Sequence, residues 1–396
     1  MEAYVVDWLS LLIRWLHIIA GIAWIGASFY FIRLDLSLAP PKRPEDVKRG
    51  VSGELWAVHG GGFYVSQKFL VGPKGEPLSN NLHWSKWEAY TTWLSGMGML
   101  AVIYWWGAST YLIDRSVMDL SPGTAILISG ASLVVGWFVY DALCRVVKSE
   151  AALAVLLFVL TVAASWGFHQ VFGARAAYLH TGALIGTIMV WNVFFQVIPG
   201  QKKMEAEIRA GREPDPTPGL IGKQRSVHNT YFTLPVLFIM MSNHYPMTYG
   251  HRYGWIVLAV LMLAGALIRQ YFVLRHLGQN PVGYIVAGIV LLGGLFFALA
   301  PKSPGAASET VSFARIAPII QERCAVCHAE KPSFAGFQQP PGGVMLERPE
   351  QIQLAAQRIY QQTVVAKVMP IGNLTKITDE ERALIAQWFN AGAKLK

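Results

Sequence analysis

Residues 8–31 read WLSLLIRWLHIIAGIAWIGASFYF, and this stretch decides the fold class. A membrane-spanning helix needs about 20 mostly apolar residues, which this stretch supplies. It is too long for the apolar region of a signal peptide, it carries Trp, Arg and His, and no A-x-A-like cleavage site follows it. We therefore expect a retained transmembrane helix here.

Further apolar stretches follow along the chain. They cover residues about 88–112, 122–144, 151–171, 174–198, 228–244, 252–274 and 281–300. Hydrophobic residues make up 53% of the sequence and charged residues only 14%, whereas soluble domains carry about 25% charged residues. This composition excludes a single water-soluble globule and a disordered chain. The sequence predicts an all-α fold, a polytopic membrane bundle of about eight transmembrane helices.

The net charge of +9 is explained by where the basic residues fall. The first, third, fifth and seventh connections between the predicted helices, with the adjoining helix ends, hold 8, 2, 6 and 2 Lys or Arg. The N-terminal segment and the other connections hold only Arg115, Arg175 and Arg252. The positive-inside rule then places the N-terminus and the segment after the eighth helix outside the cytoplasm. The basic excess marks topology, and we expect no nucleic-acid partner.

The chain changes character after residue 300. Residues 1–300 form the predicted membrane domain, 301–309 read as a linker, and 310–396 resemble a small soluble helical domain. In the last segment three acidic residues follow Thr378, which predicts an N-cap and an acidic first turn. The helix that begins there should end near Gly392.

The most specific motif in the sequence is Cys324-Ala-Val-Cys327-His328. C-x-x-C-H is the attachment signal of c-type haem, in which two thiols bind the vinyl groups and the histidine ligates the iron. A redox dithiol or half a zinc site is the alternative, but the sequence holds only three cysteines and no second Cys pair. The motif predicts a covalent haem c, and this tail resembles class I cytochromes c.

The sixth iron ligand is expected downstream of this motif. Met369 is the best candidate, because Pro370 fixes the turn that follows it. Met345, which follows Gly342-Gly343-Val344, is a competitor, since this stretch could also be a flexible loop. His/Met ligation raises the reduction potential of a haem, which suits an electron acceptor.

Two histidines lie within the predicted spans. In the first span His17 shares one helix face with Arg14, Gly21, Trp24 and Ser28, and His180 lies in the fifth span beside Gly182 and Gly186. An ionisable residue within a span is a functional candidate. His17 and His180 either pack between helices or ligate a second redox centre that carries electrons across about 30 Å of hydrocarbon to the outer haem.

The inner side carries another polar group of residues. Arg225, His228 and Asn229 open the predicted sixth span, after a connection over 199–227 that reads as a short polar helix and an extended stretch. Basic residues there are also expected as a positive-inside anchor, which is the preferred interpretation for Lys223. Arg225, Asn229 and the N–H groups of a helix start favour an anion.

The whole chain resembles the bacterial membrane-bound urate oxidases that carry a C-terminal cytochrome c. The resemblance lies in residues 15–26, 58–64, 82–90, 192–201 and 225–234, and in the tail. The first-span pattern also resembles membrane haem-binding protoporphyrinogen oxidases, which supports His17 as a haem ligand. The resemblance implies a multi-pass protein of the inner membrane, with the N-terminus and the cytochrome domain on the periplasmic side.

The resemblance implies oxidation of urate to 5-hydroxyisourate in purine degradation. Electrons would pass through a non-covalent haem b at His17 and His180 to the cytochrome and then to the respiratory chain. The catalytic base would be His228 or His59, and Arg225 and Asn229 would bind the urate oxygens. The alternatives are a membrane oxidoreductase with another donor, such as quinol, and a transporter whose cytochrome is a redox sensor.

Overall fold

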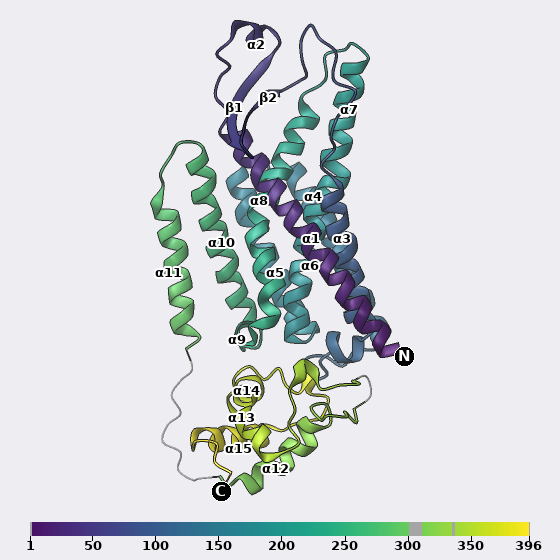
Figure 1. Ribbon diagram of the computed structural model, residues 1–396, viewed down its shortest axis with the longest axis vertical. Coiled ribbons are helices and arrows are strands. Elements are labelled where there is room, and N and C mark those ends of the chain that lie inside the picture. The colour runs from purple at the N-terminus through teal and green to yellow at the C-terminus, as the bar shows by residue number, and fades with distance from the viewer. Residues whose placement is uncertain (1, 301–310, 335–336, 396) are drawn as a thin grey trace.

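The computed structural model describes residues 2–300, 311–334 and 337–395 of the chain. Figure 1 shows a long helical bundle with a β-hairpin at one end. A small helical tail lies at the other end, beside the N-terminus. The predicted linker over 301–309 lies outside the described residues.

The elements of the bundle are mostly helices, with one pair of strands. They are α1 (Glu2–Leu36), α2 (Pro44–Lys48), β1 (Val51–His59), β2 (Gly62–Phe69), α3 (Trp87–Met99), η1 (Leu100–Trp105), η2 (Ala108–Leu112), α4 (Pro122–Val146), α5 (Glu150–Val171), α6 (Ala174–Trp191), η3 (Asn192–Val197), α7 (Ile198–Arg209), α8 (Thr217–Met241), η4 (Ser242–His244), α9 (Pro246–Tyr249), α10 (Gly254–His276) and α11 (Val282–Ala298). The tail is built from short helices. They are α12 (Phe313–Ile320), η5 (Gln321–Ala325), η6 (Pro341–Gly343), α13 (Pro349–Leu354), α14 (Ala356–Ile359), η7 (Tyr360–Val365), η8 (Ile371–Asn373) and α15 (Asp379–Asn390).

Each predicted apolar stretch lies in helical structure, but not all of them qualify as membrane spans. Among the described residues, five helical runs are long and apolar enough to cross a membrane. They are Tyr4–Leu36, Pro122–Val146, Glu150–Val171, Ala174–Arg209 and Gly254–His276. The run Val282–Ala298 is apolar but shorter. The predicted stretch 88–112 is divided among α3, η1 and η2, because the helix is interrupted at Gly107.

The sixth predicted span begins earlier than the sequence suggested. α8 begins at Thr217 and not at His228, with Pro218 in its first turn, where a missing N–H costs nothing. Arg225 and Asn229 are therefore well inside the helix. Beyond the first turn, backbone N–H groups are used within the helix. The prediction that N–H groups of a helix start bind an anion here is therefore wrong. Only side chains can bind a ligand at these positions.

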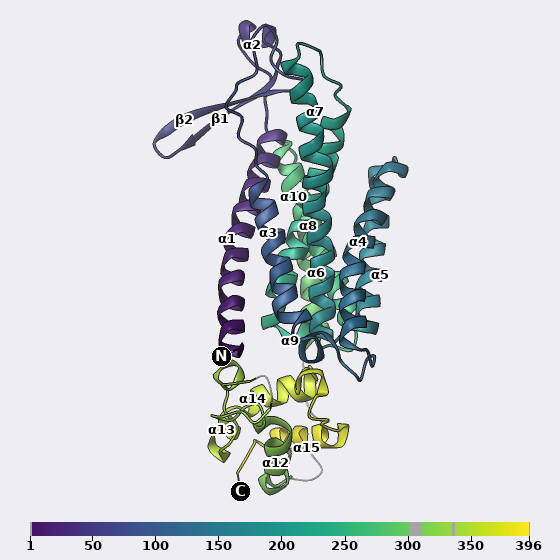
Figure 2. The same ribbon diagram turned by 90° about the vertical axis from the view of Figure 1, so that its right-hand side faces the viewer.

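The strands β1 and β2 depart from the all-α expectation. They pair antiparallel around Gly60 and Gly61, whose φ values are +57° and +81°. Two consecutive positive φ values are typical of the tight turn that matches the twist of a hairpin. The Gly-Gly pair between apolar residues is a sequence signal for this hairpin. Figure 2 shows the hairpin projecting sideways from the end of the bundle.

The tail has its own apolar core and also contacts the bundle. Ile316, Ile385 and Trp388 are at most 1% exposed. Thr378 accepts a hydrogen bond from the Glu381 N–H and α15 ends at Asn390, so the predicted capped helix is confirmed. Val368 of the tail packs against an apolar cluster of the bundle. The tail is thus held against the end of the bundle and not only tethered to it.

Candidate functional site

A polar cluster lies where α4, η3 and α8 meet, toward the end of the bundle opposite the tail (Figure 1). We call it the Arg225 cluster, and its members are Tyr140, Asp141, Asn192, Arg225, His228 and Asn229. A π-type turn often occurs at functional sites. Here η3 is such a turn, and it carries Asn192 into the cluster.

Arg225 is the buried cation of this cluster and is 2% exposed. Its Nη2 donates to Asp141 Oδ1 at 2.8 Å, and its guanidinium carbon lies 5.0 Å from the centre of the Tyr140 ring. Within the described part of the chain, Arg225 Nε and Nη1 are buried without a hydrogen-bond partner. A buried N–H left without a partner is costly. These two donors therefore offer a binding place for an anion or a carbonyl oxygen.

Asp141 holds the guanidinium in place and is itself held by two other side chains. Its Oδ1 accepts from Gln196 Nε2 at 3.1 Å, and its Oδ2 accepts from Arg145 Nε at 2.7 Å. Both carboxylate oxygens are therefore used. Asp141 balances the buried charge of Arg225 and is not free to act as a base.

The two asparagines of the cluster have different roles. Asn192 Nδ2 donates to Tyr140 Oη at 2.9 Å and to Asn229 Oδ1 at 3.1 Å. Asn229 Nδ2 donates to the Met189 carbonyl at 2.9 Å, so both ends of this amide are occupied. Asn192 Oδ1, in contrast, is buried and lacks a partner among the described residues. Asn192 thus presents an acceptor to a ligand N–H, and Asn229 orients it.

His228 connects the cluster to the protein surface. Its Nδ1 lies 2.8 Å from Tyr140 Oη, and its Nε2 lies 3.5 Å from Glu150 Oε2. The side chain of His228 is 12% exposed and that of Glu150 is 65% exposed. The sequence did not predict a role at the site for Tyr140, Asp141, Asn192 and Glu150. A signal was present for Asp141, which is a charged residue within an apolar stretch.

His59 is separate from the residues with which the sequence analysis grouped it. It is the last residue of β1, exposed beside the Gly60–Gly61 turn at the tip of the projecting hairpin (Figure 2). The structure brings Arg225, His228 and Asn229 together but leaves His59 on this hairpin. We therefore withdraw His59 as a candidate base.

An apolar cavity of about 300 Å³ lies between α1, α3, α6 and α8. Its polar lining includes Arg14, His17, Thr92, Arg175, Asn243 and His244. Gly21 and Trp24, from the first-span face predicted by the sequence, line it together with His17. Gly96, Gly182 and Gly186 keep the wall free of side chains. The cavity thus combines a mostly apolar lining with two arginines.

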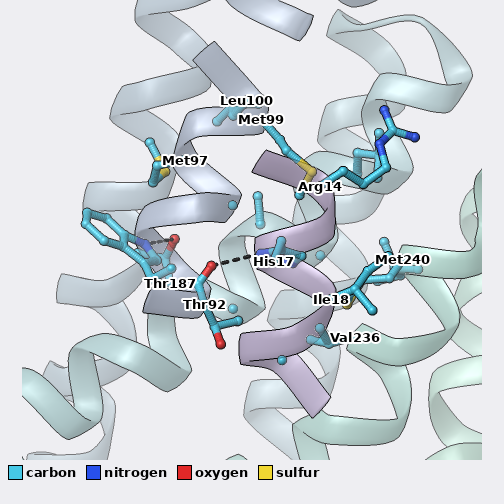
Figure 3. Close-up of a pocket in the computed structure, with 18 of the residues that line it drawn as sticks. Arg14, His17, Ile18, Thr92, Met97, Met99, Leu100, Thr187, Val236 and Met240 are labelled. Atoms are coloured by element: carbon cyan, nitrogen blue, oxygen red, sulfur yellow. Dashed lines mark hydrogen bonds between the residues drawn. The ribbon is translucent and has the colours of Figure 1, made fainter. Parts of the chain in front are cut away.

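His17 enters this cavity from α1 and is oriented by α3. Its Nδ1 lies 2.9 Å from the Thr92 carbonyl and 3.1 Å from Ser95 Oγ. Figure 3 shows the bond to Thr92. A carbonyl only accepts, so Nδ1 carries the proton in this bond. Nε2 then has a free lone pair, which is the arrangement of a metal-ligating histidine.

His180 has a different environment from His17. It is fully buried, with Nδ1 2.8 Å from the Ala176 carbonyl and Nε2 2.6 Å from Ser129 Oγ. Its neighbours Leu179 and Gly182 line the cavity, whereas His180 packs on Phe172, with ring centres 4.6 Å apart. Both ring nitrogens are occupied. His180 therefore joins α4 to α6, and the predicted ligand pair His17 and His180 is not assembled.

The C-x-x-C-H residues of the tail lie on the turn η5 and just after it. The N–H of Cys327 and the N–H of His328 both donate to the Cys324 carbonyl, at 3.1 and 2.9 Å. In the described part of the chain both cysteines are free thiols. Burial raises the pKa of Cys324 to about 12 and also raises the pKa of Cys327. Both thiols are thus neutral near pH 7.

His328 and Met369 are the two iron ligands that the sequence predicts. His328 Nδ1 donates to the Val344 carbonyl at 2.9 Å, which leaves Nε2 for a metal. Met345 follows Val344 on the Nδ1 side of the ring, so it is poorly placed to face a metal on Nε2. Arg382 Nη1 donates to the Met369 carbonyl at 2.9 Å and holds the Met369 loop. Met369 therefore remains the predicted sixth ligand.

The Met369 loop also faces the bundle. A Cβ added to Gly372 would lie 3.1 Å from the Ile113 carbonyl. A Cβ added to Gly250 would lie 2.8 Å from Ala366 Cβ. The tail therefore approaches the bundle closely on both sides of Met369.

The protein is mostly helical, and its long apolar helices are compatible with a membrane protein. The chain belongs to the family described as Urate oxidase N-terminal, whose model matches residues 3–300. This match spans the bundle and suggests a role in urate-related oxidation. No curated protein and no solved structure matched the chain.

Among the residues that the structure describes, His, Cys, Asp and Glu form no group of three or more that could hold a metal ion. A bare metal site is therefore not assigned in this part of the chain. His17 and His328 each bond a backbone carbonyl through Nδ1, which leaves Nε2 free. Single histidines suit an axial position on haem better than a metal cage.

Proposed function

We propose that this protein oxidises urate to 5-hydroxyisourate in purine degradation and passes the electrons through its cytochrome c tail to the respiratory chain. The observation that carries this proposal is the pair of unpartnered donors on buried Arg225, found in a chain of the urate oxidase family. Urate and water yield 5-hydroxyisourate, two protons and two electrons. The site must therefore bind an anion, admit water and release protons.

Substrate binding is assigned to the Arg225 cluster. Arg225 Nε and Nη1 would donate to the urate oxygens, and Asn192 Oδ1 would accept a urate N–H. Asn229 orients Asn192 through the 3.1 Å bond. His228 is the catalytic base, because a neutral imidazole nitrogen can accept a proton. It would take a proton from urate or from the attacking water through the Tyr140 hydroxyl, which lies 2.8 Å from its Nδ1.

The tail fits a covalent haem c. The thiols of Cys324 and Cys327 would bind its vinyl groups, with His328 Nε2 and the Met369 sulfur on the iron. A haem held in this way supplies a one-electron acceptor of raised reduction potential. The contact of the Met369 loop with Ile113 and the packing of Val368 support direct transfer between bundle and tail.

The cavity fits a second, non-covalent haem b. His17 offers Nε2, four glycines leave room for a flat ring, and Arg14 and Arg175 offer partners for its carboxylates. His180 is not part of this site. The cavity adjoins the Arg225 cluster, because Met189 both lines the cavity and accepts the Asn229 bond.

We further propose that the protein spans the bacterial inner membrane, with the N-terminus and tail on the periplasmic side. The tail and the N-terminus lie at the same end of the bundle (Figure 1), as the predicted topology requires. The Arg225 cluster lies toward the other end. Substrate would then enter from the cytoplasm, and electrons would leave to the periplasm.

The test is anaerobic addition of urate to the detergent-purified protein while haem absorbance is followed. Urate should reduce the haem in the wild type. Arg225→Gln should abolish this reduction, whereas Lys223→Gln, on the same helix but 54% exposed, should retain it. A pyridine haemochrome assay counts the haem in each sample.

Three results would contradict the proposal. Intact haem that urate does not reduce would exclude urate as the donor. Reduction by quinol alone would favour the alternative oxidoreductase, and urate flux without haem reduction would favour a transporter.

A further inference from the structure

A hydrogen-bonded chain leads from the buried cluster to the surface. It runs through Tyr140 on α4, His228 on α8 and Glu150 at the start of α5. Exposure rises along it, since Tyr140 is 2% exposed and the side chains of His228 and Glu150 are 12% and 65% exposed. The chain therefore connects a site closed to solvent with water at the end of the bundle opposite the tail.

The donors in this chain point in one direction. Asn192 Nδ2 donates to Tyr140 Oη, because an amide NH₂ only donates. The Tyr140 hydroxyl then directs its own proton to His228 Nδ1, 2.8 Å away. With Nδ1 accepting, His228 carries its proton on Nε2 and directs it to Glu150, 3.5 Å away. Aligned bonds of this kind polarise one another and favour proton movement outward.

Glu150 is the free base at the end of this chain. The other groups near His228 are Arg225 on its own helix, Asp141 and Cys144 on α4, and Asn192 on η3. Asp141 is committed to Arg225 and Arg145. Gln224 Nε2 donates to Glu150 Oε1 at 2.6 Å and fixes the carboxylate, which leaves Oε2 toward His228.

We propose that Glu150 is the terminal proton acceptor of a relay that removes the protons released at the Arg225 cluster. Each proton enters at Tyr140, whose hydroxyl proton passes to His228 Nδ1, while the Nε2 proton passes to Glu150 and then to water. The oxidation of one urate takes one oxygen from water and releases two electrons and two protons. Both protons leave by this route. The relay rests on the proposed function, and Glu150 acts through His228 as a positioning residue.

The test is stopped-flow reduction of the haem by urate, without oxygen, from pH 6 to 9. Glu150→Gln should lower the limiting rate about ten-fold or more and leave the urate concentration for half-maximal rate unchanged. Imidazole added to the buffer should restore the rate, which a purely structural defect would not allow. Glu205→Gln, a surface carboxylate paired with Arg209, is the matched control and should behave like the wild type.

Glu150→Asp provides a second test if the Gln variant does not fold. The shorter carboxylate should give an intermediate rate that imidazole raises to the wild-type value. A Glu150 variant equal to the wild type at every pH, with no effect of imidazole, would overturn the relay while urate oxidation stands. A wild type that urate does not reduce would overturn both proposals.

Discussion

Arg225 and Asp141 form a 2.8 Å ion pair between α8 and α4, with side chains 2% and 10% exposed. Removal of one partner of a buried pair leaves a buried charge without compensation, which costs about 3–5 kcal/mol. We expect Asp141→Asn to lower the free energy of unfolding by about that amount. Denaturant titration of the purified protein in detergent measures it.

Arg145 provides the control for this prediction. It also pairs with Asp141, at 2.7 Å, but its side chain is 65% exposed. Exposed pairs contribute about 1 kcal/mol or less, so Arg145→Gln should change stability little. Equal losses in the Asp141 and Arg145 variants would show that burial of Arg225 is not the source of the effect.

The two intramembrane histidines should respond differently to substitution. His17→Leu should remove the non-covalent haem, because Nε2 of His17 is its proposed ligand. His180→Leu should keep that haem but destabilise the bundle, because it removes the buried hydrogen bonds that the His180 ring makes with Ser129 Oγ and the Ala176 carbonyl. Haem content per chain and thermal unfolding separate the two effects. Loss of haem in the His180 variant alone would reverse the assignment.

The contact between Gly250 and the tail should control electron transfer to haem c. A side chain at Gly250 would collide with the Ala366 carbonyl, so Gly250→Leu should displace the tail from the bundle. Covalent haem should remain, and its reduction by urate should become slower. Gly293→Leu is the control, because a Cβ there meets nothing within 4 Å. An unchanged rate in the Gly250 variant would mean that electrons do not cross at this contact.

Acid should weaken the tail through Glu381. Burial raises the pKa of Glu381, but hydrogen bonds from Arg323 and the Thr378 N–H outweigh it, so the pKa lies below the ordinary value of 4.5. A carboxyl whose pKa is lowered in the folded state stabilises the fold at pH values above its pKa in the unfolded chain. This stabilisation is lost as the pH falls through the pKa of the folded state. The tail should therefore lose stability as pH drops below about 4.5.

Calorimetry of the full chain between pH 7 and 3 measures this loss. At pH 7 the Glu381→Gln variant should have a free energy of unfolding about 1 kcal/mol lower, and therefore a lower unfolding temperature, because it also loses part of a capping box. Its unfolding temperature should then depend less on pH than that of the wild type. A Glu330→Gln control that flattens the profile equally would contradict a specific role for Glu381.

Features that depend on nearby residues were predictable from the sequence. The face that joins Arg14, His17, Gly21 and Trp24 follows from helical spacing alone, and all four residues line one cavity. The N-cap at Thr378 follows in the same way from local chemistry. In such cases the residues of one segment determine its local structure.

Features that depend on packing between helices were not predictable. Asp141 and Arg225 are 84 positions apart, and only the packing of α4 against α8 shows that they pair. His180 looked like a ligand because the sequence does not show that its side chain faces Ser129 instead of the cavity. His59 looked like a base because a conspicuous histidine in a loop does not reveal that the loop is a projecting hairpin.

The helical run Ala174–Arg209 contains 36 residues. At about 1.5 Å per residue it is about 54 Å long, against about 30 Å of hydrocarbon in a bilayer. Figure 1 shows that the surplus lies at α7, which extends beyond the neighbouring helices. Arg209 at its end donates to Asn80 Oδ1 and to the Ser79 carbonyl at 3.0 Å each, which fixes a loop at that height. In the proposed membrane orientation, a solute that diffuses toward the Arg225 cluster from this side would therefore meet a rim of protein before it reaches the lipid headgroups.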